Sequence, residues 1–286
     1  MRRKLRFAKY HGCGNDFILV DEMRGPRTPD RVRRRLATKL CDRRFKVGAD
    51  GIIFIESARG VDGSMRLFEP AGNEADMCGN GIRCVAAHLC EKLHKKAVRI
   101  LTRDGVKEIA KTAGGYRVNM GKVRCTVADV KAYCSDRIVG TGSTLDINIT
   151  AKNRRLSGAL VNTGEPHLVF RSKDLESEDV VGLGEAINAD RRRFPDGVNV
   201  NFVQPAGPHE LKVRTYERGV YDETLACGTG ATATAGVALL KRWVRPGIVR
   251  VRPPGGCIEI EIGEDGDAYM TGPATKVFEG SISVNS

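Results

Sequence analysis

Four short segments of this 286-residue chain recur in the same order at almost the same distance. The first copies begin near Gly14, Asp50, Met65 and Cys78, and their counterparts, 148 to 150 positions later, begin near Gly164, Val198, Val213 and Cys227. A constant separation of this kind is the signature of an internal structural repeat. The sequence therefore predicts two copies of one domain, in agreement with a length too great for one small core.

Each copy contains the same kinds of predicted elements. Apolar runs at 51–55 and 198–203 predict strands, and longer apolar stretches at 82–93 and 231–243 predict helices. The second stretch has only small and apolar residues up to Leu240, which is typical of a helix buried on all sides. We therefore expect an α/β fold of two pseudo-symmetric domains, each a curved, mostly antiparallel sheet around a central helix.

The predicted domain boundary falls in a polar, irregular stretch at 125–145. A strand-like run that begins at 276 follows the completed second copy, so we expect it to return to the first domain. This gives an N-terminal half-domain of residues 1–130 with the return strand 276–286, and a C-terminal half-domain of residues 131–275.

The net charge of +12 and the pI near 9.4 raise the alternative of a non-catalytic nucleic-acid-binding protein. Arginine clusters at 31–35, 43–44 and 191–193 have no interleaved aromatic residues, and only 6% of the chain is aromatic. We interpret the clusters as solvated helix faces and expect no nucleic-acid partner. A positive field would still attract small anionic substrates.

The chain has no run of eighteen apolar residues, and its basic first residues lack the apolar stretch of a signal peptide. We expect a cytoplasmic protein with no membrane partner. The nine cysteines are odd in number and irregular in spacing, which argues against a disulfide framework. Without a C-x-x-C pair or clustered histidines, no metal site is expected. Most of the thiols should be small buried hydrophobes.

Two cysteines stand apart, because Cys78 and Cys227 each open a Cys-Gly-x-Gly turn just before a predicted helix. The unpaired N–H groups and the partial positive charge of a helix start favour an anion. A thiol there should have a lowered pKa, and a substrate carboxylate could bind the same N–H groups. The glycines would let the backbone approach it closely.

Inversion of a stereocentre without a cofactor needs a base on one face of the carbon and an acid on the other. Two equivalent thiols, one from each copy, fit that requirement. A buried cysteine beside a simple turn would explain one motif but not both at equivalent positions. A redox dithiol is the other alternative, although such pairs are usually close in sequence. We read Cys13, Cys84, Cys90 and Cys257 as structural.

These motifs resemble the diaminopimelate epimerases nearly from end to end. The resemblance is carried by the segments that run from Gly12 to Phe17, from Glu74 to Cys84, from Phe194 to Asn199, from Tyr216 to Gly219 and from Glu223 to Gly230. It implies cofactor-independent interconversion of LL- and meso-diaminopimelate in lysine biosynthesis. It also implies an active site in the cleft between two similar domains.

Position by position, the resemblance implies that Cys78 and Cys227 are the catalytic pair. The residues that would bind the reacting carboxylate are Gly79, Asn80, Gly228 and Thr229. Those that would hold the rest of the substrate are Asn15, Asn199, Glu217 and Arg218, the last three mainly at its far end. Arg218 can pair bidentately with a second carboxylate, and Glu217 can accept from an ammonium group.

The chain departs from the usual family pattern at three pocket positions. Glu69, which we also expect to bind the substrate, stands where the family often has Asn. Gly51 stands where the family often has Gln, and Glu165 where it often has Asn. Extra carboxylates would repel a distal carboxylate unless they face the ammonium group or turn away. A racemase of another amino acid on the same two-thiol fold therefore remains the alternative. The expected partner is a small amino-acid substrate, and a homodimer is left open.

Overall fold

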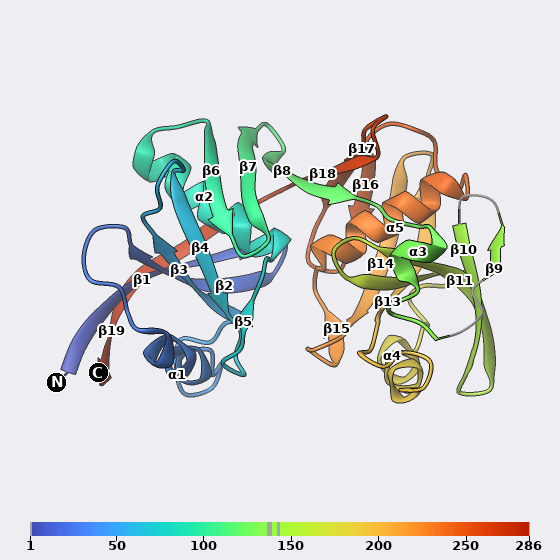
Figure 1. Ribbon diagram of the computed structural model, residues 1–286, viewed down its shortest axis with the longest axis horizontal. Coiled ribbons are helices and arrows are strands. Elements are labelled where there is room, and N and C mark those ends of the chain that lie inside the picture. Colours follow the sequence, from blue (N-terminus) through green and yellow to red (C-terminus); the bar gives the residue numbers. More distant parts are fainter. Residues whose placement is uncertain (1, 136–138, 142–143, 286) are drawn as a thin grey trace. The chain divides into compact units, whose positions relative to one another are not determined.

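The computed structural model describes residues 2–135, 139–141 and 144–285 (Figure 1). The chain divides into two compact units, which we call unit 1 (Met1–Asn119 with Thr271–Ser286) and unit 2 (Met120–Met270). The first division lies within strand β8 (Gly115–Lys122), earlier than the predicted residue 130. Of the irregular stretch at 125–145, residues 136–138 and 142–143 lie outside the described residues.

Unit 1 contains a mostly antiparallel sheet with the strand order β19-β1-β2-β3-β4-β6-β7-β8. The pairs β2–β3 and β4–β6 are parallel, and β5 pairs with the other end of β4. The final strand β19 returns to unit 1 and pairs with β1. The remaining bounds are β1 (Arg2–Gly12), β2 (Asn15–Glu22), β3 (Gly51–Glu56), β4 (Gly63–Phe68), β5 (Glu74–Ala75), β6 (Ala97–Thr102), β7 (Gly105–Thr112) and β19 (Thr275–Asn285).

Two helices cover the sheet of unit 1. The central helix α2 (Gly79–Leu93) contacts β1, β2, β4, β6, β7 and β19, whereas α1 (Asp30–Leu40) packs against β3 and β4. Leu36 and Leu40 of α1 join a buried cluster with Ile52 and Phe54 of β3. Because helices lie against it, β3 is buried along its whole length, as its continuous apolar sequence predicts.

Unit 2 has the strand order β9-β10-β11-β12-β13-β14-β16-β17, and β15 also pairs with β14. The strands are β9 (Val139–Thr141), β10 (Thr144–Ala151), β11 (Arg154–Asn162), β12 (Pro166–Arg171), β13 (Asn199–Gly207), β14 (Glu210–Glu217), β15 (Asp222–Thr224), β16 (Val249–Arg252), β17 (Ile258–Ile262) and β18 (Asp267–Gly272). The helices are α3 (Val127–Val130), α4 (Val180–Ala189) and the central helix α5 (Gly228–Leu240).

The two units share one pattern of strand pairing. The parallel pairs β2–β3 and β4–β6 of unit 1 correspond to the parallel pairs β12–β13 and β14–β16 of unit 2. The central helix α5 contacts β11 to β14, β16 and β17, much as α2 contacts the sheet of unit 1 (Figure 1). The predicted α/β fold, with one mostly antiparallel sheet and one central helix in each pseudo-symmetric domain, is confirmed.

Both central helices begin earlier than predicted, because each begins directly after its cysteine cap. The second also ends earlier: α5 stops at Leu240, and Arg242 then adopts a positive φ of 56°, which a helix cannot accommodate. Leu240 is 37% exposed, so α5 is buried on all sides only up to its last turn.

One residue of the first arginine cluster contradicts the interpretation as a solvated helix face. The Arg33 side chain is only 1% exposed, because it points from α1 toward the sheet. Its guanidinium donates to Glu22 at 2.6 Å and also to Glu56, and its Cζ lies 4.6 Å from the centre of the Phe54 ring. The charge pattern alone gave no sign of this, because the two acids come from β2 and β3.

We expect Arg33→Met to lower the free energy of unfolding by about 3–5 kcal/mol, because it leaves two buried carboxylates without their cation. Denaturant unfolding monitored by circular dichroism measures the change. Arg31→Met is the matched control on the exposed side of α1 and should change stability by less than about 0.5 kcal/mol. Equal losses in the two variants would contradict the buried ion-pair role.

Candidate functional site

Cys78 is the N-cap residue of α2 in unit 1. It has an extended backbone with φ −139° and ψ 121°, and its Sγ accepts a hydrogen bond from the Gly81 backbone N–H at 3.5 Å. A Cβ at Gly81 would lie 3.1 Å from Ile53 of the sheet, so glycine allows the helix start to pack closely there. The thiol is half-buried at the positive end of the central helix.

Two asparagines adjoin this thiol. The Oδ1 atom of Asn15 lies 3.7 Å from Cys78 Sγ and accepts a hydrogen bond from Asn80 Nδ2 at 3.1 Å. Asn15 Nδ2 donates to Asp50 at 2.7 Å, and Asp50 in turn pairs with Arg43 at 2.5 Å. The carboxylate of Asp50 can only accept, so it fixes which end of the Asn15 amide faces the thiol. We call these residues, with Gly79, the Cys78 half-site.

Cys227 has the equivalent position in unit 2, as the N-cap residue of α5. Its φ and ψ are −113° and 114°, and its Sγ accepts from the Gly230 backbone N–H at 3.4 Å. The Thr229 hydroxyl lies 3.3 Å from the same sulfur, and Gly228 is the first residue of the helix. We call these residues the Cys227 half-site.

The expectation that a helix start lowers the thiol pKa is wrong for Cys227. Burial raises the pKa of this thiol well above its ordinary value, and the nearby carboxylates of Glu217 and Glu165 raise it further. The hydrogen bonds from Thr229 and Gly230 lower the pKa, but less than burial raises it. The sequence motif indicates the helix start but not the burial of the thiol. It therefore predicted only the influence that lowers the thiol pKa.

A carboxylate and an amide pair in the same way in both units, with their positions exchanged. In unit 1 the amide of Asn15, at the start of β2, donates to Asp50, just before β3. In unit 2 the amide of Asn199 at the start of β13 donates to Glu165, just before β12, at 2.9 Å. Glu165 therefore forms with Asn199 an amide–carboxylate pair like that of Asn15 and Asp50.

Arg218 lies beside this pair in unit 2. Its backbone N–H donates to Asn199 Oδ1 at 2.9 Å, and its guanidinium lies 3.7 Å from Glu165. Burial lowers the pKa of His167 to about 3, and the charge of Arg218 adds to that effect, so the imidazole is neutral. Asn199, Arg218 and Glu165 thus form one connected group, which includes two of the predicted binding residues.

Glu217 and Glu69 have equivalent positions in the repeat but different surroundings. Glu217 ends β14 and accepts a hydrogen bond from the Thr224 hydroxyl at 2.9 Å. Glu69 follows β4 in an exposed turn, where its carboxylate accepts from the Asn73 side chain and its backbone N–H donates to Asn73 O. These contacts of Glu69 are those of a local turn.

Asp50, His167 and Asn201 have no site role predicted from the sequence. Asn201 lies directly beneath the Cys227 turn, where its Oδ1 accepts from the Thr215 hydroxyl at 3.0 Å and would lie 2.6 Å from a Cβ at Gly230. The signal was present: Asn199 and Asn201 interrupt an apolar strand at alternate positions, so both point to the same face. A buried amide on a strand needs partners, and such positions are candidates for a site.

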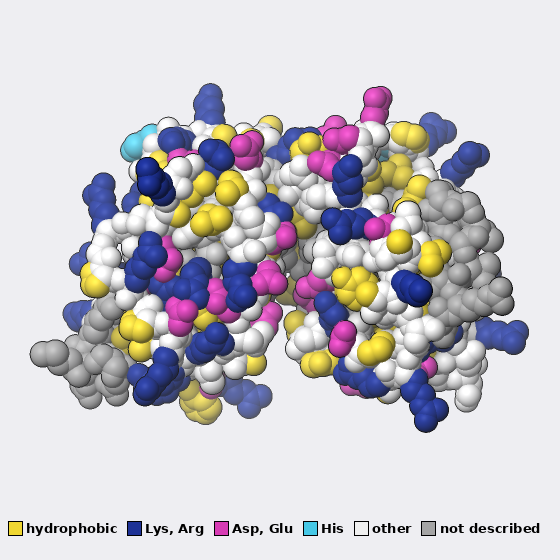
Figure 2. Space-filling view, in the orientation of Figure 1, with side chains coloured by type: hydrophobic (Ala, Val, Ile, Leu, Met, Phe, Trp, Pro, Cys, Tyr) yellow, Lys and Arg dark blue, Asp and Glu magenta, His cyan; other side chains and the backbone are white. Residues whose placement is uncertain are grey.

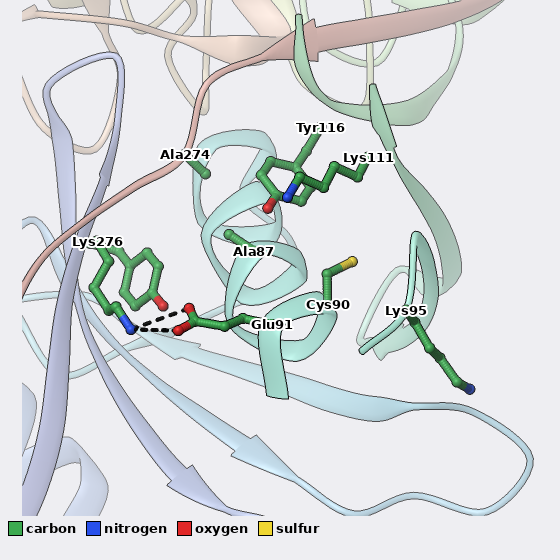
Figure 3. Close-up of a pocket in the computed structure, with 9 residues that line it drawn as sticks. Ala87, Cys90, Glu91, Lys95, Lys111, Tyr116, Ala274 and Lys276 are labelled. Carbon is green, nitrogen blue, oxygen red and sulfur yellow. Dashed lines mark hydrogen bonds and ion pairs between the residues drawn. The ribbon is translucent and has the colours of Figure 1, made fainter. Parts of the chain in front are cut away.

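A separate pocket in unit 1, with a volume of about 290 Å³, lies along the C-terminal half of α2 (Figure 3). Figure 3 shows Ala87, Cys90 and Glu91 on that helix, and dashed lines connect Glu91 with Lys276. The two oxygens of Glu91 are 2.9 and 3.2 Å from Lys276 Nζ. The nine described residues that line the pocket include none of the predicted site residues.

The molecular surface carries charges of both signs. On the face shown in Figure 2, Lys and Arg side chains are spread over both units, and Asp and Glu side chains lie among them. Within the described parts of the chain, no helix is long and apolar enough to cross a membrane. Among those same residues, no three His, Cys, Asp or Glu side chains are grouped closely enough to hold a metal ion.

A family model described as "Diaminopimelate epimerase" matches residues 7–126 and 159–277, which include every residue of both half-sites. The chain belongs to the diaminopimelate epimerase family. Its relatives include a diaminopimelate epimerase of Methanocella arvoryzae, 39% identical over 285 residues, which cover 99% of this chain and 98% of that protein. Another of Archaeoglobus fulgidus is 36% identical over 286 residues, with the same coverage. As a member of this family, the protein is an isomerase.

Solved structures of lower identity share the fold of this diaminopimelate epimerase family member. A hydroxyproline epimerase from Agrobacterium vitis, solved with bound trans-4-hydroxy-L-proline, matches with a TM-score of 0.73 at 14% identity and covers 100% of this chain and 95% of that one. A probable proline racemase from Agrobacterium radiobacter matches with a TM-score of 0.70 at 16% identity, over 98% of this chain and 93% of that one. At such identities the likeness concerns the fold alone.

Proposed function

We propose that this protein interconverts LL- and meso-diaminopimelate by a two-cysteine proton transfer at Cα, without a cofactor, on the route to lysine. One observation carries the proposal: Cys78 and Cys227 cap the central helices of two equivalent units, and each sulfur accepts an N–H from the third residue after it. A structural cysteine at one helix start would not need an exact counterpart at the other.

The proposed reaction uses both helix starts on one substrate. The backbone N–H groups at Gly79–Asn80 and Gly228–Thr229 bind the reacting α-carboxylate, where the partial positive charge of each helix stabilises the negative charge that develops on deprotonation. One cysteine, as thiolate, removes the proton from Cα and becomes a thiol. The other cysteine donates its own proton to the opposite face and becomes a thiolate. No proton is gained or lost overall, and the configuration is inverted.

The raised pKa of Cys227 supports a role for this residue as the proton donor in one direction of the reaction. Because burial and two nearby carboxylates raise this pKa, Cys227 holds its proton at neutral pH. Cys78 is half-buried and would then be the thiolate. In the reverse direction the roles exchange, as two-sided proton transfer requires.

The far end of the substrate is assigned to the group formed by Arg218, Asn199, Glu217 and Glu165. Arg218 offers a guanidinium to a distal carboxylate, and the carboxylates of Glu217 and Glu165 can accept from the distal ammonium group. In the structure Glu165 lies 3.7 Å from Arg218, so it would have to share that cation with the distal carboxylate. The carboxylate of Glu165 is 46% exposed and has room to turn away.

That same ion pair favours the alternative, a racemase of another amino acid. If Glu165 keeps Arg218 neutralised, the far pocket would accept a side chain with a cation and no second carboxylate. In either case the expected partner is a small amino acid. The cytoplasmic location and the possible homodimer remain predictions from the sequence.

Proton NMR in deuterated water tests the proposal directly. LL-diaminopimelate, lysine, arginine and proline are each incubated with the protein, and the Cα signal is followed over time. We expect diaminopimelate to lose its Cα proton signal and to form the meso isomer. Deuterium at Cα of another amino acid instead would support the alternative racemase, and exchange with none of them would contradict both.

A further inference from the structure

Arg83 lies one helical turn into α2, beneath the Cys78 half-site, and its side chain is fully buried. Its Nη1 donates to the carbonyl of Gly79 at 3.3 Å, and its Nη2 donates to Asn80 Oδ1 at 2.8 Å. Its Nε donates to Pro273 O at 3.3 Å. The guanidinium therefore contacts the first two residues of the turn that follows Cys78, from the interior of unit 1.

The equivalent residue of unit 2 has the same contact without the charge. Thr232 of α5 is also buried, and its hydroxyl donates to the carbonyl of Gly228 at 2.9 Å, as Arg83 does to Gly79. A residue that only completed the hydrogen bonds of the first turn could be Thr in both units. Arg83 adds a full positive charge near the start of α2, whereas Thr232 adds no charge near the start of α5.

Two glycines leave room for the Arg83 guanidinium. A Cβ at Gly12 would lie 3.0 Å from Arg83 Nη2, and a Cβ at Gly272 would lie 3.1 Å from its Cζ. Side chains at these two positions would crowd the guanidinium, so the surrounding sequence is adapted to a long cationic side chain.

A buried cation stabilises nearby anions far more than an exposed one, because little water screens it. Burial lowers the Arg83 pKa, and the sulfurs of Cys13, Cys84 and Cys78, in that order, counteract this through their negative charge. The interaction is mutual, so the same charge favours the Cys78 thiolate. Asp50 fixes the Asn15 amide independently of Arg83, so removing Arg83 removes its charge without reorienting that amide.

We propose that Arg83 is a positioning residue that makes Cys78, rather than Cys227, the cysteine that ionises first. It does so by placing a buried positive charge under the first turn of α2 and by fixing the Asn80 amide. This proposal rests on the proposed function, because it names the thiol that begins the proposed reaction as the base. It adds an electrostatic difference to the unequal burial of the two thiols.

Alkylation by iodoacetamide, followed over pH by mass spectrometry of the peptides that contain Cys78 and Cys227, tests this without any substrate. In the wild-type protein Cys78 should react at lower pH than Cys227. In Arg83→Met we expect alkylation of Cys78 near neutral pH to fall about tenfold, equivalent to about 1.4 kcal/mol, and that of Cys227 to stay within about twofold. Arg83→Lys keeps the charge and should restore most of the rate.

Gly12→Ala provides a second route if Arg83→Met does not fold, because it displaces the guanidinium without removing it. It should lower Cys78 alkylation in the same direction, by a smaller factor. An unchanged pH profile of Cys78 in a folded Arg83→Met or Gly12→Ala protein would overturn the proposal. The Cα exchange of diaminopimelate by the wild-type protein is a separate result, so failure of the proposed function would be recognised independently.

Discussion

Cys78→Ala and Cys227→Ala should each reduce the rate of interconversion of the two diaminopimelate isomers by at least about 10²–10⁴-fold, the range expected for loss of one acid–base group. Each variant lacks the group that removes or supplies the proton on one face of Cα, so inversion cannot be completed. The double variant should be little worse than either single variant, because the two groups act as a unit. Optical rotation or chiral chromatography measures the rate.

Isotope exchange separates loss of inversion from loss of binding. In deuterated water, each single variant retains one thiol, which can still exchange the Cα proton of the isomer whose proton it faces. We therefore expect each single variant to incorporate deuterium slowly into one isomer, with retained configuration. The two variants should act on opposite isomers. Cys90→Ala is the control, because Cys90 lies at the far end of α2, in the separate pocket, and should keep a substantial rate. Near-normal turnover of Cys78→Ala would refute the two-cysteine mechanism.

Arg218→Met should lower kcat/KM for LL-diaminopimelate by about 100-fold or more, since two hydrogen bonds between charged groups are worth about 3 kcal/mol or more together. Most of the loss should appear in KM, because the distal carboxylate is remote from the reacting carbon. The wild-type protein should prefer diaminopimelate over lysine by about 10⁴-fold, since lysine leaves the guanidinium without its partner. Steady-state kinetics with both amino acids measures the two ratios.

Glu165→Asn is the companion variant, because it restores the residue that the family often has. If Glu165 competes with the distal carboxylate for Arg218, this variant should bind diaminopimelate more tightly while Cα chemistry stays unchanged. It keeps a polar group beside Asn199, the partner of Glu165 at 2.9 Å. A wild-type preference for lysine, arginine or histidine over diaminopimelate would contradict the substrate assignment and leave the two-cysteine mechanism intact.

The sequence by itself determined the repeat, the α/β class and the two helix starts. These follow from local information: the spacing of apolar runs specifies strands and helices, and a Cys-Gly-x-Gly turn before an apolar stretch specifies a cap. The same information places Cys78 and Cys227 at equivalent positions of the repeat. The substrate-binding roles expected of Asn15 and Asn80 came from the resemblance, whereas their placement beside Cys78 comes from the structure.

Only the tertiary structure decided how charged groups are buried and paired, because their partners come from distant parts of the chain. Arg33 appeared to belong to a solvated basic cluster, yet acids from β2 and β3 enclose it. Burial, which a local motif does not report, reversed the expected pKa shift of Cys227. The pairing of Arg218 with Glu165 and the placement of Arg83 beneath Gly79 and Asn80 likewise depend on packing, since desolvation and charge proximity arise only when the chain is folded.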